Sequence, residues 1–236
     1  MKKLVYRAED RGAANHGWLN AKHSFSFANY HDPEKVHFGL LRVLNDDTIA
    51  PAMGFGMHPH DNMEIVTIPL EGAIKHRDSM GNEGIIKAGD VQIMSAGKGI
   101  VHSEVNASTT EPLKLFQIWV FPKEHNIQPR YGQKTFLPEA RKGKFQTLVS
   151  PNAEDGSLAV NQDVWFTMGD FAAGQKVSYT AKLATNGAYL MVVKGDVKVA
   201  GETLKERDAI GISDIAQIDI ETISDAELLV IDVPMD

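Results

Sequence analysis

An internal repeat of a short β-unit is the feature that most limits how this chain can fold. Residues 70–75 (Leu-Glu-Gly-Ala-Ile-Lys), which lead to 88–93 (Ala-Gly-Asp-Val-Gln-Ile), recur as 193–198 (Val-Lys-Gly-Asp-Val-Lys), which lead to 206–211 (Glu-Arg-Asp-Ala-Ile-Gly). A chain of 236 residues is also near the upper limit for a single core. Two copies of one unit therefore predict two similar barrels packed together.

The hydrophobic pattern has mostly a period of two, which is typical of strands. Three stretches are short and rich in residues that favour strands: 63–70, 113–121 and 189–193. Residues 73–78 and 83–87 flank a Gly-Asn turn signal, which predicts a hairpin. We expect an all-β fold with antiparallel barrels and few short helices, with helical turns near 106–111, 137–141 and 151–155.

The repeat also suggests domain bounds. We expect a first barrel over 1–125, a connection over 126–145 that is rich in proline and basic residues, and a second barrel over 146–236. A strand from the N-terminus can cross from one barrel to the other.

The composition excludes several classes of function. The formal net charge is −7 and the basic residues are scattered, so we expect no direct nucleic-acid partner and no membrane surface. The chain has no cysteine, which excludes disulfides, thiolate catalysis and cysteine-ligated metals. No signal-peptide core and no stretch of about 20 apolar residues is present, so a cytoplasmic location is expected.

Two pairs of polar residues have the spacing of metal ligands. His58 and His60 are two residues apart, and so are His102 and Glu104. Side chains two apart on a strand point to the same face of a sheet, so each pair can aim at one point inside a barrel. Imidazole and carboxylate groups are ligands of divalent transition metals. The spacing alone is not specific, because paired histidines are also common as surface or core residues.

The second copy of the repeat has no such residues. All nine histidines lie at or before His125. Aligning the copies on Gly72 and Gly195 predicts Ala181 and Leu183 in place of the first pair, and residues near Ile220 and Thr222 in place of the second. An aliphatic side chain cannot bind a metal, so the second barrel is predicted to be packed and free of metal.

These residues resemble the cupin pattern and, more narrowly, the pirin family. The resemblance is carried by 15–19 (Asn-His-Gly-Trp-Leu), 23–30 (His-Ser-Phe-Ser-Phe-Ala-Asn-Tyr), 55–65 (Phe-Gly-Met-His-Pro-His-Asp-Asn-Met-Glu-Ile), 78–82 (Asp-Ser-Met-Gly-Asn) and 92–104 (Gln-Ile-Met-Ser-Ala-Gly-Lys-Gly-Ile-Val-His-Ser-Glu). It is specific over the first half of the chain and more diffuse over the second. It implies a bicupin, two double-stranded β-helix barrels of which the N-terminal one holds the metal.

The resemblance also implies which residues bind the metal. His58, His60 and His102 would be three ligands, and Glu104 would be the fourth. Glu64 is the competitor, because many other cupins take their carboxylate from that position. The pirin family implies iron(II), while copper, nickel, manganese or zinc are also compatible with these donors.

As a function, the resemblance to bacterial pirins implies quercetin 2,3-dioxygenase activity, in which dioxygen opens the central ring of a flavonol and carbon monoxide is released. Glu104 is the candidate catalytic base, and a small planar aromatic molecule the expected substrate. The main alternative is an iron-dependent regulatory protein that acts through protein partners. A sugar isomerase and an inert bicupin with a structural metal are the remaining alternatives.

Overall fold

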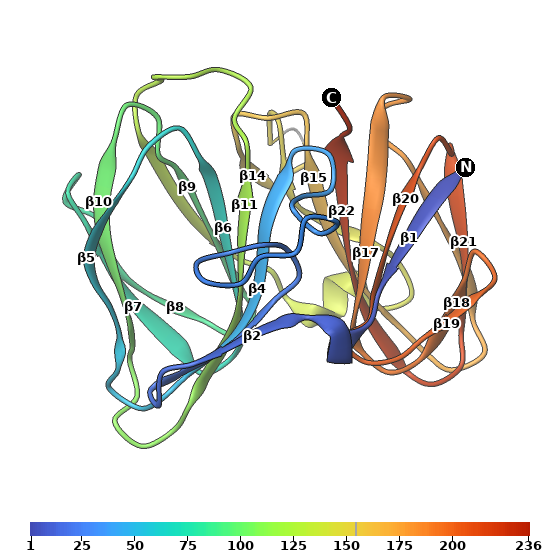
Figure 1. Ribbon diagram of the computed structural model, residues 1–236, viewed down its shortest axis with the longest axis horizontal. Helices are drawn as coiled ribbons and strands as arrows, with labels where there is room; N and C mark the ends of the chain where they lie inside the picture. Colours follow the sequence, from blue (N-terminus) through green and yellow to red (C-terminus); the bar gives the residue numbers. More distant parts are fainter. Residues whose placement is uncertain (154) are drawn as a thin grey trace.

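The computed structural model describes residues 1–153 and 155–236. Over these residues the chain folds into two β-barrels side by side, without any α-helix (Figure 1). This confirms the predicted all-β fold of two antiparallel barrels. The first barrel contains β2 (Gly12–Asn15), β3 (Leu19–His23), β4 (Leu41–Ile49), β5 (Gly54–His60), β6 (Glu64–Glu71), β7 (Ala73–Asp78), β8 (Glu83–Lys87), β9 (Asp90–Ser95), β10 (Ile100–Asn106), β11 (Leu113–Val120) and β12 (Arg130–Thr135). The second contains β1 (Lys2–Tyr6), β13 (Gln146–Ser150), β14 (Leu158–Ala159), β15 (Trp165–Phe171), β16 (Lys176–Thr180), β17 (Asn186–Lys194), β18 (Val197–Val199), β19 (Glu202–Leu204), β20 (Ala209–Ser213), β21 (Gln217–Thr222) and β22 (Ala226–Pro234).

Each barrel consists of a large and a small sheet with equivalent strand orders. Among the described strands, the first barrel has the orders β12-β9-β6-β11-β4-β3-β2 and β5-β10-β7-β8. The second has β1-β20-β17-β22-β15-β13-β14 and β16-β21-β18-β19. Gly72 and Gly195, on which the repeat aligns, both have a positive φ, 80° and 82°. A residue without a Cβ adopts this conformation freely, so the same turn requires glycine in both copies.

The N-terminal strand belongs to the second barrel. Its residues pair antiparallel with β20, from Lys2 with Ser213 to Tyr6 with Ala209. Figure 1 shows this strand, in blue, beside the orange and red strands, before the chain crosses to the other barrel. The first 3-10 helix, η1 (Ala8–Asp10), lies on this crossing.

The segment 126–145 is only partly a connection. It contains β12, which pairs with β9 from Arg130–Ser95 to Thr135–Asp90 and so extends the large sheet of the first barrel. The predicted helical turn near 137–141 is present as the 3-10 helix η2 (Pro138–Arg141). The exact bounds of the domains stay a prediction.

No helix forms at 106–111. The side chain of Asn106 instead holds this loop, because its Nδ2 donates to the carbonyl oxygens of Ile49 and Glu111 and its Oδ1 accepts the N–H of Ser108. These hydrogen bonds compete with those of a helix. The turn predicted at 151–155 includes residue 154, which is outside the described residues; its other residues are not helical.

The main apolar core lies between the barrels. Alternate residues of the two large sheets point toward each other there, as for Val66 and Ile68 of β6 and Met191 and Val193 of β17. The side chains between them, Thr67 among them, point into the barrels. A separate apolar cluster fills the second barrel. The alternation of each strand therefore serves two purposes, since one face joins the barrels and the other lines an interior.

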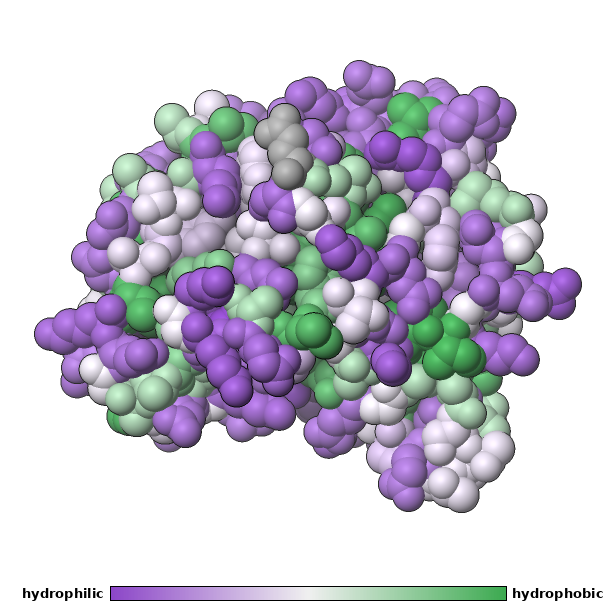
Figure 2. Space-filling model, turned by 180° about the vertical axis from the view of Figure 1, so that it is seen from behind, coloured by the Kyte–Doolittle hydropathy of each residue, from purple (hydrophilic) through white to green (hydrophobic). Residues whose placement is uncertain are grey.

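The surface seen in Figure 2 is mostly hydrophilic, with hydrophobic residues in small separate patches. Among the described residues, no helix has the length and apolar character needed to span a bilayer.

Candidate metal centre

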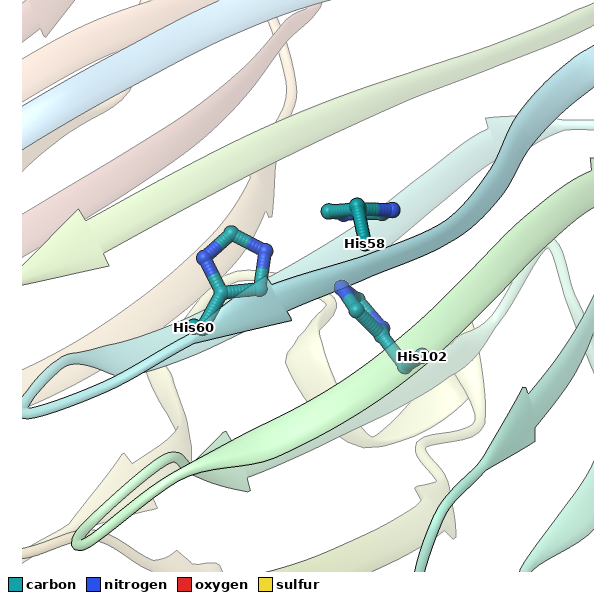
Figure 3. Close-up of side chains that lie close together, drawn as sticks. All are labelled: His58, His60 and His102. Carbon is teal, nitrogen blue, oxygen red and sulfur yellow. The ribbon is translucent and has the colours of Figure 1, made fainter.

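Two neighbouring strands of the small sheet bring three histidines together. His58 and His102 lie opposite each other where β5 pairs with β10, and His60 is two residues further along β5 (Figure 3). Pro59, between the two β5 histidines, cannot donate to a ladder, and β5 is an edge strand, where proline is tolerated. The sequence His-Pro-His is therefore compatible with a strand at a sheet edge such as this one.

The three imidazoles are close enough to share one ion. One ring nitrogen from each of His58, His60 and His102 lies within 4.8 Å of the others. The ring centroids are 4.4 Å apart for His58 and His102, 4.9 Å for His58 and His60, and 5.0 Å for His60 and His102. The side chains converge in Figure 3 as they do in these distances.

A hydrogen bond determines which ring nitrogen of His58 can bind a metal. Nδ1 of His58 is 2.7 Å from the carbonyl oxygen of Gly56. A carbonyl oxygen only accepts, so Nδ1 carries the proton and the lone pair is on Nε2. His102 is 1% exposed, and neither of its ring nitrogens has a hydrogen-bond partner among the described residues. A buried imidazole without hydrogen-bond partners destabilises the fold unless a ligand from outside the polypeptide binds its nitrogens.

The electrostatics keep two of these rings neutral. Burial lowers the pKa of His102 to about 3, with the nearby histidines His58, His60 and His76 adding to the effect. Burial, followed by the charge of His58, lowers the pKa of His60 to about 4. Neutral imidazole is the form that binds a metal.

Glu104 lies on the same face of β10 as His102. One of its carboxyl oxygens accepts a hydrogen bond from Nε2 of Gln117 at 3.0 Å, and the other lies 3.4 Å from Oγ1 of Thr67. Burial raises the pKa of this carboxyl group above its usual range. A second cluster, again within 4.8 Å, joins Glu104 with His102 and His76. Glu104 is thus next to the three histidines through the ring that both clusters share.

Glu64, the competing carboxylate, has other contacts. Its Oε2 accepts hydrogen bonds from Oγ of Ser95 at 2.6 Å and from the N–H of Asn161 at 2.9 Å. It belongs to neither of the clusters found among the described residues. Asn161 lies outside the first barrel, so Glu64 helps to join two parts of the chain.

His76 is a fourth histidine beside this site. It is fully buried on β7, where it pairs with Glu104, and its ring stacks on that of Tyr131 with centroids 4.9 Å apart. Its Nε2 is 3.3 Å from the carboxyl group of Asp78, while Nδ1 has no partner among the described residues.

The donor set fits a divalent transition metal. Neutral imidazoles, a nearby carboxylate and the unpartnered nitrogens of His102 suit such an ion, and the chain has no cysteine thiolate that would favour a softer metal. Sites with ligands on one side only leave coordination positions open for a substrate.

A cavity of about 180 Å³ opens beside the histidines. Its walls come mainly from β3, β4, β5 and β11, and include Leu19, Ala21, His23, Phe27, Asn45, Asp47, Ile49, Phe55, His58, His60, Glu104, Leu115, Gln117 and Trp119. The ring of Trp119 meets that of His60 edge to face, at 5.0 Å and 81°.

The polar residues of this wall were missed from the sequence. Asn45 and Asp47 share the inward face of β4 with the apolar Ile49, and Gln117 lies between Leu115 and Trp119 on the inward face of β11. A polar side chain at an inward position of an otherwise apolar strand is the signal that could have found them.

The second barrel has no metal site at the equivalent positions. Asn106 pairs with Ile74, two residues past Gly72. Thr222 pairs with Val197, two residues past Gly195. Thr222 therefore corresponds to Asn106, not to Glu104.

The predicted equivalences were two residues too far along the chain. The counterparts of His58, His60, His102 and Glu104 are, in this order, Tyr179, Ala181, Ile218 and Ile220. The shift arises because the hairpin β18–β19 is shorter than β7–β8 and the connection from β16 to β17 is longer than that from β5 to β6. The conclusion is unchanged, since none of the four offers an imidazole or a carboxylate.

Known proteins resemble this chain over its whole length. A family described as Pirin matches residues 6–120, and one described as Quercetinase C-terminal cupin domain matches residues 147–233. The protein of Escherichia coli K12 named quercetin 2,3-dioxygenase is 47% identical over 237 residues, which cover 98% of this chain and 99% of its own length. The chain belongs to the pirin family. The predicted family is thereby confirmed.

Other pirins agree. The putative quercetin 2,3-dioxygenase of Pseudomonas aeruginosa is 45% identical over 225 residues, covering 94% of this chain and 95% of its own. The crystal structure of the bacterial pirin YhhW from Escherichia coli in complex with nickel(II) superposes with a TM-score of 0.93 at 44% identity, covering 99% of each chain.

Proposed function

We propose that this pirin is a metal-dependent dioxygenase that cleaves flavonols such as quercetin. The observation that carries the proposal is the convergence of three imidazoles beside a cavity. The substrate class is supported by relatives that carry the name quercetin 2,3-dioxygenase and match nearly the whole chain. A cavity at the histidines favours an enzyme over a regulatory protein, which would need a surface patch rather than a hollow.

The proposed ligands are His58, His60, His102 and Glu104, and the proposed metal is iron(II). These three imidazoles and one carboxylate would hold the metal from one side and would leave it accessible to a substrate from the cavity. The related pirin crystallised with nickel(II), so nickel is the first metal to compare with iron.

The bound metal supplies Lewis acidity, which stabilises a flavonol hydroxyl group in its deprotonated form. The protein positions the ligands. The carbonyl oxygen of Gly56 fixes the tautomer of His58, and the ring of Trp119 limits how His60 can turn. This preorganisation saves the cost of ordering the site when the substrate binds.

Glu104 is the proposed base. Its carboxyl group lies next to His102 and lines the cavity in which the flavonol would bind, so it is within reach of a hydroxyl group there. It takes the proton of the flavonol 3-hydroxyl group, while the hydrogen bond from Gln117 holds the carboxylate in place during the transfer.

The size of the cavity limits how a flavonol binds. Pockets that enclose drug-sized ligands have volumes of roughly 300 Å³ or more, and this cavity is about 180 Å³. The edge of the flavonol that binds the metal would therefore enter the cavity, and the remaining rings would extend out of it.

The test is turnover by protein of known metal content. The protein is stripped of metal, reloaded with iron(II) or nickel(II), and supplied with quercetin while oxygen uptake and carbon monoxide release are measured. We expect the metal-loaded protein to take up oxygen and release carbon monoxide in equal amounts. Equal rates with metal-free protein would refute the proposal.

A pair of variants makes the test specific. His58→Ala should lose both metal and turnover, whereas His31→Ala, at an exposed position in a loop, should lose neither. Turnover by a His58→Ala protein without metal would show that the activity arises elsewhere.

A further inference from the structure

Strand β4 carries a carboxyl group into the wall of the metal cavity. Asp47 is 4% exposed and lines the same cavity as His58, His60 and Glu104. Its Oδ1 is buried and has no hydrogen-bond partner among the described residues. No group in the described part of the chain forms an ion pair with it.

Such a group is costly to the fold. Burying a carboxyl group without hydrogen bonds costs several kcal/mol relative to leaving it in water. The charges that act on it make this worse, since Asp46 and Glu104 are both acidic. Asp46 itself is satisfied on the other face of the strand by Arg11 at 3.2 Å and Arg207 at 3.4 Å.

The second barrel contains a buried carboxyl group whose hydrogen bonds are satisfied within the chain. Asp232 is fully buried and accepts three hydrogen bonds, from the hydroxyl group of Tyr179 at 3.0 Å, the N–H of Lys182 at 2.7 Å and Nδ2 of Asn186 at 2.6 Å. Asp47 has no comparable set of donors. Its cost to stability therefore indicates a partner from outside the chain.

The other polar residues of the cavity wall are already engaged. The side-chain oxygen of Asn45 is bonded to Nδ1 of His23 at 2.8 Å. Gln117 donates to Glu104 and accepts from Thr67. Asp47 is thus the carboxyl group of this wall that remains free to bind a ligand.

We propose that Asp47 is a specificity-determining residue, whose carboxyl group hydrogen-bonds a hydroxyl group of the aromatic substrate held at the metal. This inference rests on the proposed function. A hydroxyl group both donates and accepts, so it pairs with a carboxylate and with a neutral carboxylic acid alike. The site selects rings that carry a hydroxyl group in addition to the one that binds the metal, and it disfavours the same ring system without it.

Two flavonols and two variants test this. Quercetin has several ring hydroxyl groups, and 3-hydroxyflavone has only the one next to the carbonyl. For the metal-loaded wild type we expect kcat/KM to be higher for quercetin. In Asp47→Leu the ratio of the two kcat/KM values should fall by about 10-fold or more, and in Asp47→Asn by less, because an amide still pairs with a hydroxyl group. Asp219→Leu, the same change at an exposed residue of the second barrel, is the matched control and should keep the wild-type ratio.

Two further readouts separate specificity from structure. Asp47→Leu should keep the wild-type metal stoichiometry, and its thermal midpoint should not fall, because an unpaired buried carboxyl group has been removed. An unchanged substrate ratio, or a lower midpoint together with loss of metal, would overturn the proposal.

Binding distinguishes failure of this proposal from failure of the proposed function. Dissociation constants for both flavonols can be measured without oxygen, from quenching of tryptophan fluorescence, since Trp119 lines the cavity. If the wild type binds quercetin more tightly than 3-hydroxyflavone but turns over neither, the dioxygenase function fails while the role of Asp47 is still decided by the variants. If Asp47→Leu binds quercetin as tightly as the wild type, Asp47 has no such role.

Discussion

The two barrels share a strand order but differ in what fills them. In the first barrel, Gln117 of β11 pairs with Thr67 of β6. The matching pair in the second barrel is Val230 of β22 with Leu190 of β17. The same replacement occurs in the small sheets, where Glu104 pairs with His76 in one barrel and Ile220 pairs with Val199 in the other.

This difference separates folding from chemistry. The apolar interior of the second barrel is continuous, whereas in the first barrel apolar clusters lie at the two ends of a polar centre. Buried apolar area stabilises a fold, and buried polar groups without partners oppose it. We infer that the second barrel contributes stability while the first carries a site that the same architecture does not require.

The largest expected effect comes from giving the first barrel a residue of the second. His102→Ile places the residue found at Ile218 between the remaining histidines. We expect metal binding to be lost and turnover to fall by more than about 100-fold, since removal of a ligand exceeds the 10–100-fold cost of losing a residue that supports one. Elemental analysis and oxygen uptake measure both.

The same variant tests the cost of the polar centre. In metal-free protein, His102→Ile should be at least as stable as the wild type, because an unpartnered buried imidazole has been replaced by an apolar side chain. A clearly lower midpoint of urea unfolding would show that His102 supports the fold even without metal.

The reverse exchange, in which the second barrel receives a residue of the first, should lower the free energy of unfolding and leave metal binding and turnover unchanged. Ile220→Glu introduces at a site that is 2% exposed a carboxyl group without any of the partners of Glu104. We expect a loss of about 3–5 kcal/mol in the free energy of unfolding, the cost of an uncompensated buried charge. Urea unfolding measures it, with Ile220→Leu as a control that should cost less than about 1.5 kcal/mol.

A smaller effect is expected from pH. In the unfolded chain His102 takes up a proton as the pH falls through about 6.5, whereas in the folded chain its pKa is lowered to about 3. Between these values the unfolded state binds more protons, so acid lowers the stability of metal-free wild type. His102→Ile lacks this group, and its thermal midpoint should rise relative to that of the wild type between pH 7 and pH 4. A difference of midpoints that does not change with pH would contradict the lowered pKa.

The smallest effect concerns the buried carboxyl group of the second barrel. Tyr179→Phe removes one of three donors to Asp232 and should cost about 1–2 kcal/mol of stability. Metal content and the turnover of quercetin should be those of the wild type. Loss of metal in this variant would mean that the two interiors are coupled, which the comparison of the barrels does not predict.

Much of the fold could be predicted because the repeat is visible in the sequence. Gly72 and Gly195 keep the same turn, and alternation identified strands such as 113–121. The residues Ala181 and Leu183 were nonetheless assigned wrongly, because loops of different length lie between the glycines and the strands of the small sheets. The register in which the strands pair determines which side chains of the two barrels correspond, and this register cannot be read from the sequence.

The candidate site shows a similar limit. The i, i+2 spacing was enough to bring His58, His60 and His102 to one point. Asp47 and Gln117 were missed, because alternation states that two residues share a face but not which face becomes the interior. That depends on the packing of the two barrels against each other, which uses the opposite face of the same strands.

The place of β1 has a consequence for how the protein is made. Its partner β20 is synthesised about 200 residues later, which at ribosomal rates of 5–20 residues per second is a delay of roughly 10–40 s. During this time the leading strand has no edge to join, although most of the first barrel is already complete. We therefore expect that a bulky fusion ahead of Lys2 would disturb the barrel that emerges last, far along the chain from the point of attachment.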